Sequence, residues 1–122
     1  MTKIIFHLLN IIIVFLYIYP GSLLGFIIYK DISKQPQISP DLFTLSSNHV
    51  YAFFVLSILG LLAYFKSLKI IILYLILISI ILELSHLLIP NRSFQFSDLF
   101  GNIVGVLISI FILILFNFWR KK

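Results

Sequence analysis

The chain has 122 residues, of which 61% are hydrophobic and 16% aromatic, and its mean hydropathy is +1.17. A soluble domain of this length still exposes much of its surface to water, so it cannot hide so many apolar side chains in one core. The composition therefore excludes an ordinary soluble domain and predicts an integral membrane protein. The net charge of +5 does not indicate nucleic-acid binding, because the basic residues stand singly or in short clusters at the ends of apolar runs. The absence of cysteine excludes disulfides, thiol catalysis and cysteine-ligated metal.

Four apolar segments follow one another along the chain, and a helix needs roughly 20 residues to cross the ~30 Å apolar core of a bilayer. The first segment contains Pro20 and Gly21, which either kink its helix or end it early. We expect it to be retained, because no small-x-small cleavage site follows it. The sequence thus predicts one all-α domain, residues 1–122, built as a bundle of four transmembrane helices. We expect these helices at about residues 4–28, 48–65, 69–89 and 98–119.

The segments between the helices predict how they are connected. Residues 30–48 form the only long polar connection, and Pro36 and Pro40 make a long helix there unfavourable. The apolar residues Leu42 and Phe43 within it can lie on the membrane surface. Residues 66–69 form a very short link, so the second and third helices should be antiparallel neighbours.

The distribution of charge predicts the orientation in a cell membrane that the chain crosses several times. With four spans, the outer side carries Lys30, Lys34 and Arg92 together with all four carboxylates. The other side carries six basic residues and no acid, so the positive-inside rule places both termini in the cytoplasm. These six residues are Lys3, Lys66, Lys69, Arg120, Lys121 and Lys122.

The polar residues of the outer side converge on the stretch between the third and fourth helices. Glu83 is expected about two turns inside the end of an apolar helix, where an unpaired carboxylate is costly. If the stripe on its helix faces the stripe of Asp98 on the next helix, Arg92 in the connecting loop can reach either carboxylate. The candidate ligand-binding or site-organising residues are His49, Glu83, His86, Arg92, Asp98 and Asn102.

Several of these residues also have ordinary structural explanations. Asp98, with Ser97, is suited to cap the fourth helix and to complement its dipole. Arg92 can anchor in lipid headgroups, while Pro90 and Asn91 are typical turn residues.

A stripe of small residues, Gly101, Gly105 and Ser109, runs along the fourth helix. This spacing allows another helix to approach closely. The partner is either a helix of the same chain or a second copy, so a homo-oligomer is one candidate assembly.

The order and spacing of these polar residues resemble the signature of VanZ-like membrane proteins over residues 47–109. That signature combines a glutamate and a glutamine with a Pro-Gly-Arg turn, an aspartate and an Asn-x-x-Gly helix start, and it follows a helix that carries a histidine. His86 stands here where the family usually has glutamine, and Asn91 where it usually has glycine. Apart from His86, which matches in position only, the residues that carry the resemblance are His49, Ala52, Phe53, Glu83, Pro90, Arg92, Ser93, Phe94, Asp98, Asn102 and Gly105.

The resemblance implies a small envelope protein associated with reduced susceptibility to glycopeptides such as teicoplanin. We expect the outer polar cluster to bind, or to alter access to, a lipid-linked envelope precursor or a lipoglycopeptide among the membrane lipids. Arg92 is suited to a phosphate or carboxylate group. An intramembrane enzyme that acts on a lipid-linked substrate is the alternative, because His49, Glu83, His86 and Asp98 are able to do acid and base chemistry. A partner or transporter subunit is a further alternative.

Neither a metal nor another cofactor is expected. Glu83 and His86 have a familiar ligand spacing on one helical face, but two residues do not make a metal site. The family's glutamine at the position of His86 also argues against ligation.

Overall fold

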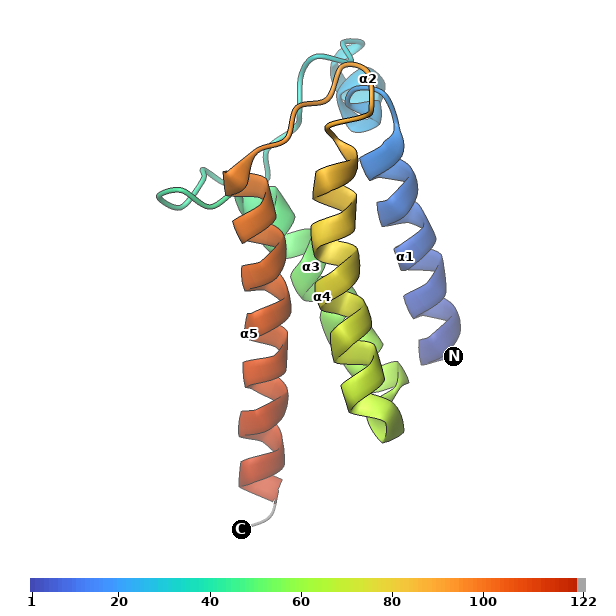
Figure 1. Ribbon diagram of the computed structural model, residues 1–122, viewed down its shortest axis with the longest axis vertical. Helices are drawn as coiled ribbons and strands as arrows, with labels where there is room; N and C mark the ends of the chain where they lie inside the picture. Colours follow the sequence, from blue (N-terminus) through green and yellow to red (C-terminus); the bar gives the residue numbers. More distant parts are fainter. Residues whose placement is uncertain (121–122) are drawn as a thin grey trace.

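The structure is a computed structural model that describes residues 1–120. Within that range all the regular elements are helices, joined by turns and loops (Figure 1). Lys121 and Lys122, which contribute to the predicted charge asymmetry, lie outside the described residues. The helical elements are α1 (Thr2–Ile18), α2 (Leu23–Tyr29), α3 (Ser47–Ala63), the short 3-10 helix η1 (Phe65–Ser67), α4 (Leu68–Ser85) and α5 (Phe96–Arg120).

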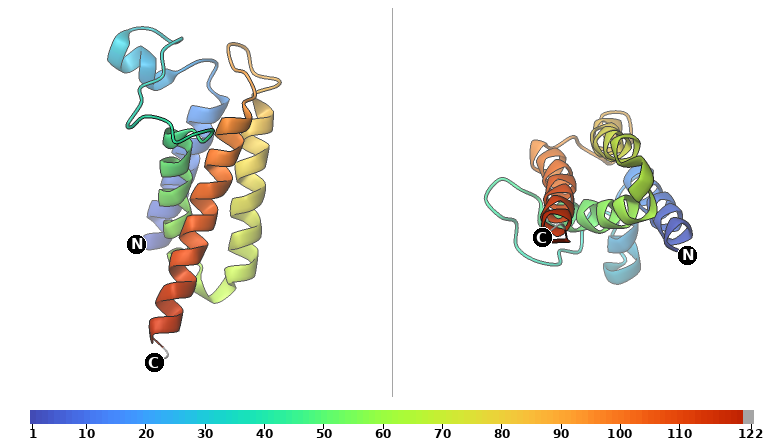
Figure 2. Two further views of the ribbon diagram at one scale, coloured as in Figure 1. Left: turned by 90° about the vertical axis from the view of Figure 1, so that its left-hand side faces the viewer. Right: turned by 90° about the horizontal axis from the view of Figure 1, so that it is seen from below.

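The four long helices form a bundle whose centre is α3. This helix packs against α1, α4 and α5, most extensively against α5. Helix α1 begins and α5 ends towards one end of the bundle, while α2, the connection after it and the loop between α4 and α5 gather at the other end (Figures 1 and 2). We call that second end the upper end. The short connection through η1 makes α3 and α4 antiparallel neighbours, as predicted.

The bundle has an apolar exterior and keeps several polar side chains inside. Ser57, Ser79, Ser109 and Asn102 are fully buried beside core residues such as Leu56. Large apolar side chains are exposed along α1, α4 and α5. This distribution fits a protein that is surrounded by lipid, because water would penalise such an exterior.

Helix lengths decide how many spans the structure supports. The segments Phe65–Ser85 and Phe96–Arg120 are each long and apolar enough to cross a membrane. Helices α1 and α2 pass the same test only together, and they are bent by 84° at their junction. Helix α3 is apolar but has only 17 residues, which makes it slightly too short to count as a span by the same test. By length and composition, residues 1–120 therefore contain two helices that could cross a membrane, or three spans if the bent pair is one.

The first predicted helix, residues 4–28, is two helices in the structure. Helix α1 ends at Ile18, and Gly21 adopts a φ of 105°, a left-handed conformation that strongly favours glycine. Ser22 then caps α2 by accepting a hydrogen bond from the Gly25 amide at 2.9 Å. Of the two alternatives, Pro20 and Gly21 thus end the helix and do not merely kink it.

The third helix ends four residues earlier than the predicted limit of 89, at Ser85. Pro90 explains the difference, because it lacks an amide hydrogen and disfavours the helical conformation of the residue before it. The chain continues through turns up to Asn91, whose φ is 60°. Glu83 accordingly lies in the last helical turn, and not two turns inside the helix.

Candidate functional site

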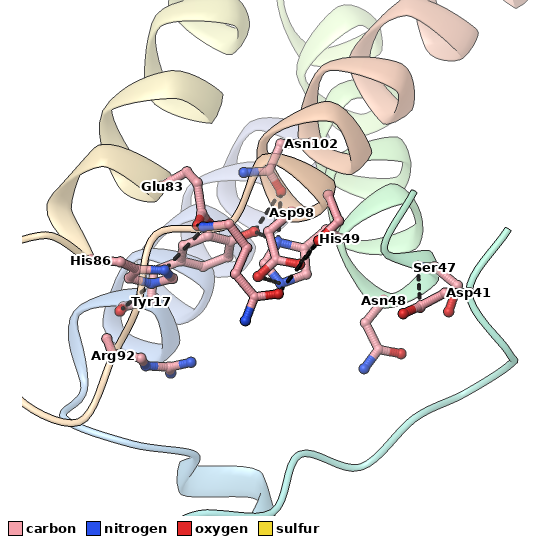
Figure 3. Close-up of polar contacts among 12 residues, drawn as sticks. Tyr17, Asp41, Ser47, Asn48, His49, Glu83, His86, Arg92, Asp98 and Asn102 are labelled. Atoms are coloured by element: carbon pink, nitrogen blue, oxygen red, sulfur yellow. Dashed lines mark hydrogen bonds and ion pairs between the residues drawn. The ribbon is translucent and has the colours of Figure 1, made fainter. Parts of the chain in front are cut away.

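The upper end of the bundle holds a buried polar cluster around a residue that the sequence analysis did not single out, Tyr17 of α1 (Figure 3). Its hydroxyl donates to the Asn102 Oδ1 of α5 at 2.6 Å and lies 2.6 Å from the His49 Nδ1 of α3. Its ring is stacked on the His86 ring, with centroids 5.4 Å apart. Tyr17 thereby connects His49 of α3 with His86, which directly follows α4.

One arm of the cluster joins α3 and α5. The His49 Nε2 lies 3.5 Å from an Asp98 carboxylate oxygen, and His49 Nδ1 lies 3.0 Å from Asn102 Oδ1. Asn102 is fully buried and donates through Nδ2 to the Ser79 carbonyl oxygen at 3.0 Å. This last bond fixes which way the amide of Asn102 points.

The other arm joins the end of α4 to α1. His86 Nε2 lies 3.1 Å from the Tyr17 carbonyl oxygen, which can only accept, so this nitrogen carries a hydrogen. His86 Nδ1 lies 3.3 Å from Glu83 Oε2, and Glu83 is fully buried. The amide of Gln95 donates to Glu83 Oε1 at 3.0 Å, which ties the loop after α4 to the cluster.

Arg92 does not pair with either carboxylate in the described part of the chain. Its guanidinium donates to the carbonyl oxygens of Leu16 at 2.7 Å and of Tyr19 at 3.1 Å, at the C-terminal end of α1. These carbonyls carry the negative end of the helix dipole, so they attract a cation. Burial lowers the pKa of the Arg92 guanidinium from its usual value, but arginine stays charged in proteins. Two of its five donor hydrogens are used, which leaves three for a ligand.

The small-residue stripe, whose partner the sequence left open, faces α3. A Cβ at Gly101 would lie 2.7 Å from the Ser46 carbonyl oxygen, and one at Gly105 would lie 2.5 Å from that of Val50. Ser109 donates to the Phe54 carbonyl oxygen at 3.0 Å. The stripe therefore brings α5 close to α3 of the same chain, which sets the distance between Asp98 and His49.

Asp98 was expected to cap α5 and to complement its dipole, and the structure supports only the second role. It lies in the first turn of that helix, where its charge complements the dipole, but its carboxylate is directed at His49. A different helix, α3, is capped by a carboxylate: Asp41 accepts a hydrogen bond from the amide of its first residue, Ser47, at 3.0 Å. This bond lowers the pKa of the Asp41 carboxyl group from its usual value.

Two cavities meet at the cluster. The first, of about 560 Å³, is mainly apolar and lies between α1, α2 and α3, with Leu9, Ile12 and Leu24 among its lining residues. The second, of about 550 Å³, is more polar and lies under the loop between α4 and α5. Both volumes fall in the range of small-molecule sites. The residues that line both cavities are Ser22, Gln35, His86 and Arg92.

Comparison with known proteins identifies the family from nearly the whole chain. A family model described as VanZ/LLP1 matches residues 5–117. The chain belongs to the VanZ/LLP1 family. Together with the apolar helices, this membership supports a VanZ-like membrane protein. No curated protein and no solved structure matches the chain.

The structure explains one departure from the VanZ-like signature. Asn91 stands where the family usually has glycine, and its φ of 60° lies in the left-handed region. Asparagine tolerates that region better than other residues with a side chain. Asparagine is thus compatible with the left-handed turn that precedes Arg92.

The convergence of candidate residues from three helix ends was predicted from the sequence, but several of their hydrogen-bond partners were not. Tyr17 sits in an apolar run and is one of six tyrosines, so no local pattern distinguished it. Gln95 and Ser79 contribute through a backbone amide and a carbonyl oxygen, which every residue type offers. Asp41 was visible only as a charge in a loop. The binding role of the six candidate residues stays a prediction.

Proposed function

We propose that this VanZ-like protein resides in the cell membrane and binds an amphiphile with a lipid tail and an anionic headgroup. The observation that carries the proposal is the junction of the two cavities at His86 and Arg92. An isoprenyl or acyl tail suits the apolar cavity, and a phosphate or carboxylate suits the polar one. Such a ligand is a lipid-linked envelope precursor or a lipoglycopeptide.

Arg92 is the residue proposed to bind the headgroup. Arg92 lines both cavities, and its guanidinium is held in place by the carbonyl oxygens of Leu16 and Tyr19. The remaining donors form the kind of planar fork that binds phosphate and carboxylate. Because Arg92 makes no ion pair with Glu83 or Asp98 in the described range, a ligand need not displace a carboxylate to reach it.

The proposal includes four membrane crossings with both termini in the cytoplasm. Helix α3 has 17 residues, which is at the lower limit for a span, and it packs between the three other long helices. The predicted charge asymmetry then places the polar cluster at the outer leaflet. In this orientation the cluster meets envelope precursors and externally added drugs.

Resistance is proposed to follow from this binding. A protein that holds a lipid-linked precursor, or the lipid tail of the drug, at the outer leaflet lowers the drug's access to its target. The effect should be stronger for teicoplanin, which carries a lipid tail, than for vancomycin, which does not.

Growth inhibition of a susceptible Gram-positive host that expresses the protein tests this function. We expect selective protection against teicoplanin, lost in the double variant Arg92→Ala, Glu83→Gln at equal abundance. Arg120→Ala is the matched control, because it removes an exposed arginine from the opposite end of the bundle. Protection that survives the double variant, or no protection by the wild type, contradicts the proposal.

An enzyme that acts on the same amphiphile is the second candidate. It is favoured by the two histidine–carboxylate pairs, His49 with Asp98 and His86 with Glu83, beside the junction of the cavities. Conversion of a labelled lipid-linked precursor by the purified protein would distinguish catalysis from binding. The partner-subunit alternative has less support, since the stripe of Gly101 and Gly105 is occupied by α3 of the same chain.

A further inference from the structure

The hydrogen bonds around His49 determine which of its nitrogens can act as a ligand. Asn102 donates through Nδ2 to the Ser79 carbonyl oxygen, so its Oδ1 faces Tyr17 and His49. The Tyr17 hydroxyl donates its single hydrogen to that Oδ1. The contact of 2.6 Å between Tyr17 and His49 Nδ1 then requires His49 Nδ1 to be the donor. In neutral His49 the lone pair therefore lies on Nε2.

This lone pair points into a group of carboxylate oxygens. Nε2 lies 3.5 Å from Asp98, and one ligand atom from each of His49, Glu83 and Asp98 lies within 4.8 Å of the others. A lone pair and a carboxylate repel each other unless a proton or a cation lies between them. The same requirement extends to Glu83, because its fully buried carboxylate and that of Asp98, whose side chain is 17% exposed, approach one small volume.

Glu83 provides a second and independent indication. The residue is fully buried, and its Oε2 has no hydrogen-bond partner. His86 Nδ1 approaches this oxygen to 3.3 Å, but the contact does not have the geometry of a hydrogen bond. Arg92 does not supply the missing donor, because its guanidinium is engaged by helix carbonyls. A buried carboxylate oxygen without a donor is suited to coordinate a metal ion.

We propose that His49 Nε2, Glu83 and Asp98 bind a divalent transition-metal cation, Zn²⁺ or Mn²⁺. Imidazole and carboxylate are ligands that these ions accept, and a site with three protein ligands leaves coordination positions open. Two carboxylates and one neutral histidine balance the charge of a divalent cation. Tyr17 and Asn102 serve as the outer partners that hold His49 in the ligating tautomer.

The metal ion would also contact the headgroup of the proposed ligand, and this part of the inference rests on the proposed function. Asp98 lines the polar cavity and His49 lines the apolar one, so the cation would lie beside their junction. An anionic headgroup held by Arg92 could then occupy an open coordination position. Metal binding itself does not depend on such a ligand, and it can be tested alone.

Metal uptake by the purified chain in detergent tests the site. After treatment with a chelator, the protein is titrated separately with Zn²⁺ and Mn²⁺, and bound metal is counted by equilibrium dialysis and elemental analysis. We expect one saturable ion per chain together with a higher melting temperature. Glu83→Gln and Asp98→Asn should abolish this uptake, and Tyr17→Phe should weaken it by about 10–100-fold, as is typical of outer partners. His7→Gln, which changes a histidine at the other end of α1, should leave it intact.

A spectroscopic measurement on the wild type keeps the test independent of variant folding. Mn²⁺ bound to protein labelled with ¹⁵N-histidine should show hyperfine coupling to one imidazole nitrogen, and this coupling should persist in His7→Gln. Absence of saturable uptake, or uptake without imidazole coupling, overturns the proposal. In that case protons, and not a metal ion, lie between the histidine nitrogens and the carboxylate oxygens. Either negative result leaves the lipid-binding proposal standing, because that proposal is tested through Arg92.

Discussion

The substitution Gly105→Ala tests the close contact between α3 and α5 that positions the cluster. A methyl group there would lie 2.5 Å from the Val50 carbonyl oxygen and 2.8 Å from the Phe54 amide nitrogen, whereas ordinary contact begins at 3.4 Å. Both neighbours are backbone atoms of α3, so they cannot move aside by a rotamer change. The two helices must separate, which also moves His49 of α3 away from Asp98 of α5.

The expected size of the effect follows from two opposing terms. Overpacking costs about 1–3 kcal/mol, and a clash with backbone atoms belongs at the upper end of this range. Alanine regains about 1 kcal/mol of helix propensity over glycine. We therefore expect Gly105→Ala to lower the free energy of unfolding by about 2 kcal/mol.

Unfolding in mixed micelles, followed by circular dichroism, measures this change. Gly60→Ala is the matched control, because the atoms nearest its Cβ are side-chain atoms and not backbone atoms, the closest being Phe6 Cε2 at 2.9 Å. That variant should stay within about 1 kcal/mol of the wild type. Equal or greater stability of Gly105→Ala, with Gly60→Ala the more damaging change, would refute the proposed packing of α5 on α3.

Three further predictions concern individual contacts. Tyr17→Phe removes the hydroxyl that joins His49 to Asn102, so thermal or chemical unfolding should show a loss of about 1–3 kcal/mol, and no loss would contradict its bridging role. The pKa of Asp41 is lowered in the folded chain, so its contribution to stability is present above the usual value of about 3.9 and disappears as the pH falls through the lowered value. Melting curves should therefore show a smaller loss on acidification for Asp41→Asn than for the wild type, and equal losses would refute this linkage. Asn91→Ala should destabilise by about 1 kcal/mol because of the left-handed backbone, whereas Asn91→Gly should not, and unfolding of the two variants in parallel decides the point.

The sequence was sufficient to predict the fold class and the end of the bundle where the polar residues gather. Composition alone requires a lipid-facing exterior, and the spacing of Glu83, His86 and Asp98 around a proline turn predicts that two helix ends lie close together. The family resemblance was confirmed by the match over residues 5–117. The number of spans and the position of the termini stay predictions, because the structure supports two or three spans by helix length.

The contacts within the cluster could not be predicted, because they depend on helix ends and on backbone groups. The sequence left Arg92 either within reach of a carboxylate or anchored in lipid headgroups, whereas the end of α1 at Ile18 exposes carbonyl oxygens that bind it. The stripe of Gly105 could have faced any helix, and only the packing of the whole bundle directs it to α3. Tyr17 gave no local signal, since its hydroxyl becomes important only when α3 and α5 bring His49 and Asn102 to it.

Binding of a long-chain isoprenyl phosphate to the purified protein in lipid nanodiscs tests the central claim most directly. The account predicts saturable binding that falls at least tenfold, about 1.4 kcal/mol, in Arg92→Ala but not in Arg120→Ala. Filling the apolar cavity with Ile12→Trp should weaken binding of the same lipid, while leaving the arrangement of Arg92 unchanged. Equal affinity of the wild type and Arg92→Ala would contradict the claim that the junction of the two cavities holds an anionic headgroup.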